Sequence, residues 1–156
     1  MADAMLRDRI KAELKEAMRA RERRKTATLR LISAALKDRD IAARTKGVPD
    51  GIDEMQILGM LQTMVKQRRE SIDHYEQGGR LELAEQEREE IDIINDFLPP
   101  RLDEDAIEAA VGSVIDELGA ASIKDMGRTM AELRERYAGQ MDFGKASALV
   151  KSRLAL

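Results

Sequence analysis

Few side chains in this sequence could perform catalysis or bind a metal. Cysteine is absent, and histidine occurs once, at His74. A single imidazole holds a metal only with carboxylate ligands beside it, and the nearby Glu70 and Asp73 follow no metal-binding pattern. The sequence therefore predicts a structural histidine, on the surface or half-buried, and no metal site.

A second candidate is a series of carboxylates with helical spacing. Di-metal carboxylate bundles use Glu-x-x-His pairs on facing helices, and this sequence contains no such pair. We therefore expect the series to form a solvated helix face: Glu82, Glu85, Glu89 and Asp92.

Nucleophilic and nucleotide chemistry also lack the residues they need. The sequence has no Gly-x-x-x-x-Gly-Lys-Ser/Thr loop and no Rossmann glycine set. No histidine is arranged to activate a serine at any of these positions: Ser33, Ser71, Ser122 and Ser147. The sequence therefore predicts no catalytic residue, no cofactor and no enzymatic activity of the chain by itself.

Charge is distributed unevenly along the 156 residues, although the net charge is only −3. Residues 1–46 hold 14 Lys and Arg against 7 Asp and Glu, whereas residues 47–100 hold 5 against 13. One interpretation is that basic and acidic helices pack together and neutralise each other. The other is a basic face for an anionic partner. A membrane-surface helix fits least, because the basic segment contains no Trp or Phe.

Composition also bears on the cellular setting. No apolar run approaches the ~20 residues that span a bilayer, and basic residues interrupt the first turns, unlike a signal peptide. The absence of Cys suits a reducing compartment. We expect a cytoplasmic protein that does not associate with membranes.

Apolar residues recur with helical spacing throughout, which predicts an all-α fold. Four helices are expected before Phe97-Leu98-Pro99-Pro100, where the two prolines end the last of them. The charged stretch 19–25 is expected to join the first two helices, and residues 85–90 to lie on the outside of the fourth. Three shorter helices are expected afterwards. The predicted domains are therefore an N-terminal four-helix unit, residues 1–98, and a smaller three-helix C-terminal domain, residues 101–156.

One helix of the predicted C-terminal domain contains an unexpected glycine. Ser122 and Asp125 have the spacing of a capping box, so Gly127 lies in the first turns of a helix. Glycine there costs about 1 kcal/mol relative to Ala. It indicates either a close helix–helix approach or an open patch of backbone for a partner, with Arg128 beside it.

The chain resembles the GatB/YqeY family nearly end to end. The most specific match is Asp125-Met126-Gly127-Arg128-Thr129-Met130, followed by Gly139, Asp142 and Val150-Lys151. Earlier matches are residues 13–18, 29–32, 66–72, Gly79-Arg80, Glu87, Glu90, Ile91 and Phe97-Leu98-Pro99. Phe97 stands where the family commonly has Tyr, which removes a hydroxyl.

The resemblance implies a stand-alone protein similar to the C-terminal tail of the B subunit of the tRNA-dependent amidotransferase. In that enzyme the tail resembles a tRNA-recognition appendage, and catalysis belongs to other domains. A tRNA-binding accessory module is therefore the favoured interpretation. The alternatives are a protein–protein adaptor of the translation machinery, and an accessory to glutamine-dependent amidation of mischarged tRNA, a carbon–nitrogen ligase activity.

The resemblance also suggests where RNA would bind. Contacts would be to the backbone and shape of the tRNA, since aromatic residues for base stacking are scarce. The candidate nucleic-acid-binding residues lie in the C-terminal domain: Gly127, Arg128, Lys145 and Lys151. The expected partners are tRNA and translation-related proteins.

Overall fold

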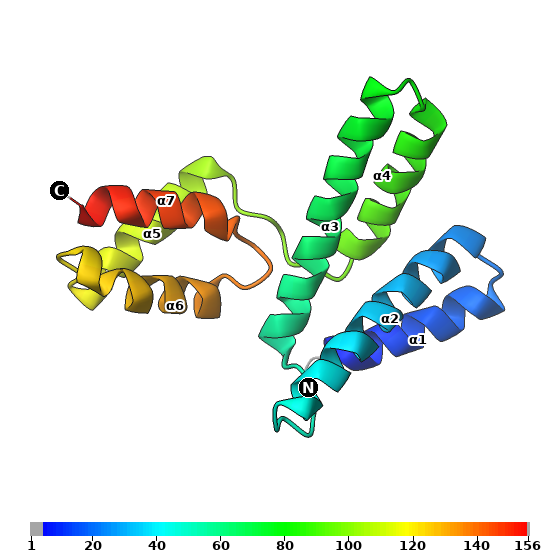
Figure 1. The fold of residues 1–156 in the computed structure, drawn as a ribbon, viewed down its shortest axis with the longest axis horizontal. Helices are drawn as coiled ribbons and strands as arrows, with labels where there is room; N and C mark the ends of the chain where they lie inside the picture. Colours follow the sequence, from blue (N-terminus) through cyan, green and yellow to red (C-terminus); the bar gives the residue numbers. More distant parts are fainter. Residues whose placement is uncertain (1–4, 156) are drawn as a thin grey trace. The chain divides into compact units, whose positions relative to one another are not determined.

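The computed structural model describes residues 5–155 as helices joined by short connections (Figure 1). The α-helices are α1 (Leu6–Arg19), α2 (Arg23–Thr45), α3 (Glu54–Gln77), α4 (Leu81–Asn95), α5 (Glu104–Leu118), α6 (Met126–Arg136) and α7 (Phe143–Leu154). A short 3-10 helix, η1 (Ile123–Asp125), precedes α6. Residues 5–155 contain no strand, which confirms the all-α prediction.

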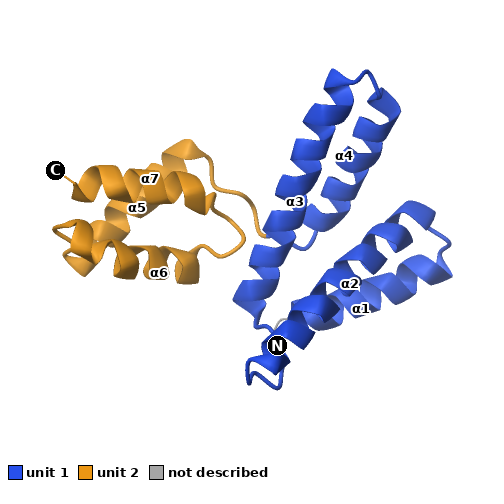
Figure 2. Cartoon of the chain, viewed as in Figure 1, with its two compact units in different colours: residues 1–98 blue, residues 99–156 orange. Residues whose placement is uncertain are grey.

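The chain divides into two compact units (Figure 2). Unit 1 comprises residues 1–98 and contains α1 to α4, while unit 2 comprises residues 99–156 and contains α5 to α7. The division falls at Leu98-Pro99, where the prolines prevent α4 from continuing.

Local capping signals set where several helices begin. Asp53 and Gln56 form a reciprocal capping box at the start of α3, and the Asp103 carboxylate accepts from the Ala106 N–H at 2.8 Å. Asp142 accepts from the Gly144 N–H at 3.0 Å and so begins α7. These caps satisfy N–H groups that have no partner inside the helix.

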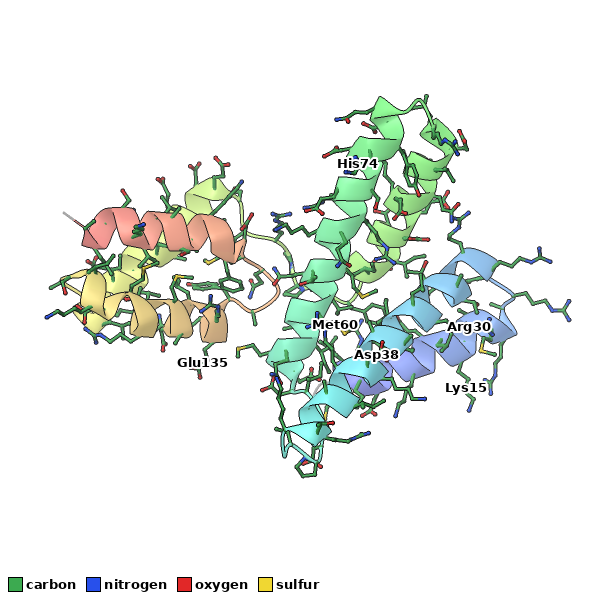
Figure 3. All side chains as sticks on the ribbon, in the orientation of Figure 1. Lys15, Arg30, Asp38, Met60, His74 and Glu135 are labelled. Atoms are coloured by element: carbon green, nitrogen blue, oxygen red, sulfur yellow. The ribbon has the colours of Figure 1, made fainter. Side chains whose placement is uncertain are left out.

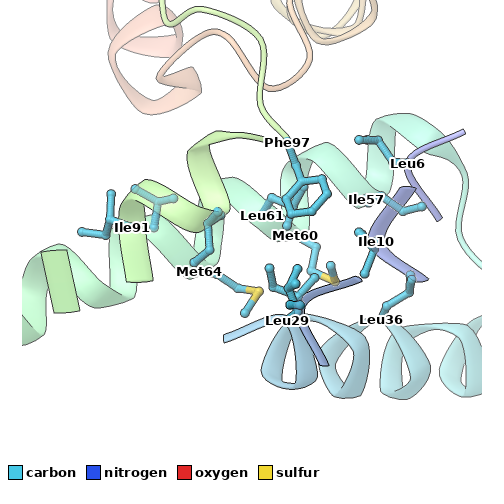
Figure 4. Packing of buried hydrophobic residues seen from close by; sticks show 14 of the residues in the cluster. Leu6, Ile10, Leu29, Leu36, Ile57, Met60, Leu61, Met64, Ile91 and Phe97 are labelled. Carbon is cyan, nitrogen blue, oxygen red and sulfur yellow. The ribbon is translucent and has the colours of Figure 1, made fainter. Parts of the chain in front are cut away.

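Unit 1 consists of the α1–α2 hairpin and the α3–α4 hairpin around an aliphatic, Met-containing core (Figure 4). Leu29, Ile32 and Leu61 are fully buried between the helices. Phe97 is also buried, and the Arg9 guanidinium lies 5.2 Å from the centroid of its ring. Phe97, two residues before the first proline, therefore anchors the end of unit 1 to α1.

A buried ion pair connects parts of unit 1 that are distant in sequence. The Arg7 guanidinium donates to both carboxylate oxygens of Asp40, and Arg7 Nη2 also donates to the Ile52 carbonyl at 2.9 Å. The Ile52 N–H donates to Asp40 Oδ1 at 3.0 Å. Gly51, with φ +82°, passes against the Asp40 side chain, where a Cβ would collide with it. Asp40 thus fixes the end of α2 to α1 and to the α2–α3 loop.

Two expectations about unit 1 need correction. The connection between α1 and α2 is confined to residues 20–22, because α2 already begins at Arg23. The middle of α4 is not wholly outside, because Glu87 and Glu90 are half-buried against Arg68 of α3.

Unit 2 packs α5, α6 and α7 around a small apolar core. Val111, Val114, Leu133 and Val150 have no exposed surface. Gly119 ends α5 in the left-handed conformation, with φ 61°. Helices α6 and α7 run in opposite directions, so that the start of α6 and the end of α7 lie at the same end of the unit (Figure 1).

Candidate nucleic-acid interface

The start of α6 is built by η1 and its capping box. The Asp125 carboxylate accepts from the backbone N–H groups of Ala121 at 2.9 Å and Ser122 at 3.2 Å. These two hydrogen bonds hold the pKa of Asp125 below its usual value, and the bond from Ala121 has the largest effect. The neighbouring Arg128 lowers the pKa further. Asp125 is therefore a carboxylate at neutral pH, and it fixes the turn from which Arg128 projects.

Gly127 is exposed in the first turn of α6. Beyond its chain neighbours and the backbone of its own helix, a Cβ built on it would meet no heavy atom within 4 Å. The interpretation of a close helix–helix approach at this glycine is therefore wrong, because no neighbouring helix lies close enough to exclude a side chain there. The cost of placing glycine in the helix is not offset by packing.

Arg128 and Lys151 are both exposed at the η1 end of unit 2. The Arg128 side chain is 50% exposed, and its Nε donates to Asp125 Oδ1 at 3.1 Å. Lys151 lies in the last turns of α7, the helix that neighbours η1. The structure thus places Gly127, Arg128 and Lys151 at one end of unit 2.

Lys145 lies apart from those three residues. It is in the first turn of α7, six residues before Lys151, a separation of about 9 Å along the axis and about 120° around it. Its ammonium contacts Glu104 Oε1 at 3.1 Å, near the start of α5. It also lines a shallow hollow with Arg101 and Asp142. The structure does not bring Lys145 together with Arg128.

The rejected metal and catalytic candidates are distributed as their spacing suggests. His74, Glu82, Glu85, Glu89 and Asp92 are all exposed (His74 is labelled in Figure 3). Within residues 5–155, no group of three or more His, Cys, Asp or Glu side chains could hold a metal ion.

One acidic cluster was missed from the sequence. Arg68 Nε contacts Glu90 Oε2 at 3.0 Å and lies 4.0 Å from Glu87 Oε2. Burial, followed by the nearby Glu90 charge, raises the pKa of Glu87. Arg68 could have indicated this cluster from the sequence, because it is a cation among the regularly spaced apolar residues of α3 and so needs an acidic partner. The cluster is an internal α3–α4 contact and does not form a site for a ligand.

The helices described for residues 5–155 include none that is both long and apolar enough to cross a membrane.

Comparison with known proteins identifies relatives of this chain. A protein 31% identical over 111 residues is "Altered inheritance of mitochondria protein 41, mitochondrial" of Lachancea thermotolerans; the match covers 70% of this chain and 57% of that protein. The protein of the same name from Eremothecium gossypii is 28% identical over 149 residues, covering 94% and 79%. A third, from Candida glabrata, is 33% identical over 89 residues, covering 57% and 47%.

The chain spans about half to three fifths of the length of several of these relatives. The family model described as Yqey-like protein matches residues 7–154, which includes all seven α-helices except the first residue of α1. The chain belongs to the YqeY-like protein family.

Proposed function

We propose that this protein is a non-catalytic accessory module that binds structured RNA, with tRNA as the favoured class. The observation that carries the proposal is the exposed Gly127 at the start of α6, which no packing contact explains. A glycine there leaves the backbone accessible to a sugar–phosphate chain. Arg128 beside it, and Lys151 at the same end of unit 2, supply cations for phosphate oxygens.

The start of a helix suits this role on electrostatic grounds. The helix dipole favours anions at this end, although η1 leads directly into α6 and the Met126 N–H donates to the Ile123 carbonyl. The Asp125 carboxylate occupies two N–H groups just before α6 and pairs with Arg128. A phosphate would share Arg128 with Asp125, so the contact is expected to be weak and salt-dependent.

The experiment measures binding of fluorescently labelled, unfractionated tRNA to the full chain over a range of salt concentrations. Each duplex-like phosphate contact contributes about 0.9 to the slope of log affinity against log salt. Replacing Arg128 and Lys151 with Ala should therefore flatten the slope by up to about 1.8 and weaken binding to all tRNA species alike.

The matched control replaces Arg101 and Lys145 with Ala. It removes the same charge from exposed side chains at the other end of α7, which contact Asp142 and Glu104. If both double variants changed tRNA affinity and its salt dependence equally, Arg128 and Lys151 would not form a specific binding site. Absence of tRNA binding by the wild-type chain at low salt would contradict the function and favour a protein–protein adaptor.

We also propose that the protein acts in a reducing aqueous compartment such as the cytoplasm. The sequence contains no Cys that could form a disulfide. The relatives are named as mitochondrial proteins, and that location belongs to those proteins by name. Fractionation of cells that express the tagged chain tests the location.

A further inference from the structure

The turn between α1 and α2 holds an arginine in a backbone conformation that favours glycine. Arg21 has φ 57°, the only positive φ of a non-glycine residue within residues 5–155. Its N–H donates to the Met18 carbonyl at 3.3 Å, and the Glu22 N–H donates to the Ala17 carbonyl at 3.0 Å. This is the Schellman pattern at a helix end, in which the left-handed position is usually glycine.

The first turn of α2 is also arranged against the usual preference. Arg23, Arg24 and Lys25 occupy it, no acidic residue does, and Glu22 makes no side-chain cap. Cations at a helix N-terminus are disfavoured by the helix dipole. Two independent features of this turn thus oppose stability, and both place positive charge at the same point.

Little of this charge is neutralised within the molecule. Residues 15–30 contain seven Lys and Arg but only Glu16 and Glu22 as acids. In the part of the chain that the structure describes, one ion pair involves these cations, between Arg24 Nε and Glu89 Oε2 at 3.4 Å. By contrast, Arg128 and Arg136 of unit 2 each contact an acid of their own helix or turn.

Five cations of the α1–α2 turn and the helix ends beside it make up what we call the hairpin tip: Lys15, Arg19, Arg21, Arg23 and Arg30. All five are exposed. Lys15 and Arg19 are one turn apart on α1, and Arg23 and Arg30 are two turns apart on α2, so each pair shares a helix face. Figure 3 labels Lys15 and Arg30 on the two arms of the hairpin.

We infer that the hairpin tip docks the phosphate backbone of the structured RNA; this inference rests on the proposed function. Guanidinium groups match phosphate oxygens in a bidentate manner. Residues 15–30 contain no aromatic side chain for stacking on bases, so the contact reads backbone and shape. The N-terminal dipole of α2 adds to the positive potential.

An anionic membrane fits the same surface less well. A membrane-surface helix needs a free apolar face, whereas Leu6, Ile10 and Ala17 of α1 are buried in the core. The exposed apolar residues here are Met18 and Leu31, one on each helix.

The first test replaces Arg19 and Arg23 with Gln and measures binding of unfractionated tRNA. If each makes one duplex-like phosphate contact, the slope of log affinity against log salt falls by about 1.8. Extrapolated from 1 M salt, this is about a 60-fold loss of affinity at 0.1 M.

The matched control replaces Lys37 and Arg39 with Gln. Both residues are exposed on α2, the helix that contains Arg23. Lys37 lies about 21 Å from Arg23 and about 10 Å from Arg30 along α2, so at 0.1 M salt the control should lose clearly less affinity than the Arg19 and Arg23 variant. Equal losses of tRNA affinity from both pairs of substitutions would overturn the inference that the hairpin tip binds RNA. No loss from Arg19 and Arg23, while the wild type still binds tRNA, would overturn it and leave the proposed function standing.

The second test is Arg21→Gly, for which stability and binding should change in opposite directions. Glycine relieves the left-handed backbone and should raise the melting temperature. Loss of one phosphate contact should weaken tRNA binding about 8-fold at 0.1 M salt. A fall in both would overturn the inference, because Arg21 would then be structural. Binding to phosphatidylserine vesicles should be measured in a parallel experiment. Vesicle binding that depends on Arg19 and Arg23, without tRNA binding, would assign the hairpin tip to membranes and also overturn the inference.

Discussion

Replacing Asp40 with Asn should destabilise unit 1 by about 3 kcal/mol. Removal of one partner from a buried ion pair costs about 3 to 5 kcal/mol, because the other charge stays behind without a counter-charge. The side chains of Arg7 and Asp40 are 25% and 8% exposed, so solvent access at Arg7 places the cost at the lower end of that range. The asparagine still offers an oxygen to the Ile52 N–H, but its amide NH2 replaces the oxygen that accepts from Arg7 Nη1, so the variant loses that hydrogen bond together with the charge.

The pKa of Asp40 gives this prediction a pH dependence. The hydrogen bond from Arg7, assisted by the Ile52 N–H, lowers that pKa below its ordinary value, although burial opposes the shift. A carboxyl whose pKa is lowered by folding contributes stability above its unfolded pKa of about 3.9, and the contribution disappears as the pH falls through the folded pKa. The difference between wild type and variant should be constant from about pH 7 to pH 5 and should narrow below about pH 4.

Urea denaturation followed by far-UV circular dichroism measures the difference. The control is Asp38→Asn, which removes the same charge from an exposed residue of the same helix (Figure 3) and should change stability by no more than about 0.5 kcal/mol. If the two variants are equally stable, Asp40 does not hold unit 1 together as described.

Gly51→Ala should destabilise the chain by about 2 kcal/mol in urea, since φ is +82° and the new Cβ would collide with Asp40; an unchanged midpoint would contradict this. Thr28→Val should stabilise the chain by about 1 kcal/mol, because the buried Thr28 Oγ1 has no hydrogen-bond partner among residues 5–155; a lower melting temperature would argue against it. The purified chain should hydrolyse neither glutamine nor ATP, and turnover that co-purifies with the protein would refute this. Limited proteolysis should cut first near Pro100 or within residues 47–51, and an initial cut inside a helix would contradict the division into units.

Helix starts could be predicted from sequence because their determinants are local. Asp53, Asp103 and Asp142 each cap a helix through backbone groups two or three residues away. Spacing of apolar residues and the pair of prolines likewise depend on near neighbours. These signals were enough for the fold class and the helix order.

Contacts between distant residues could not be predicted in the same way. Asp40 and Arg7 are 33 residues apart, and only the place of Asp40 in the register of Leu29, Ile32 and Leu36 indicated its burial. Arg68 gave a similar signal on α3. The left-handed Arg21 could not be predicted, because glycine is the residue that marks such a turn.

The candidate interface depended still more on three-dimensional placement. The sequence joined Arg128, Lys145 and Lys151 into one surface, but helix geometry turns Lys145 away from Lys151 and toward Glu104. Within the described part of unit 2, four of the eight Lys and Arg residues, Arg128 and Lys145 among them, form ion pairs with nearby acids. The α1–α2 turn became a candidate only when its backbone conformation was known.

The salt dependence of tRNA binding by the unmodified full chain tests whether the protein is an RNA-binding module. Anisotropy of labelled, unfractionated tRNA would be titrated at salt concentrations from about 50 to 300 mM. Contacts by three to five of the cations named above predict a straight line of log affinity against log salt with a slope between about −3 and −5. Absence of binding at the lowest salt, or an affinity independent of salt, would contradict phosphate binding by these cations.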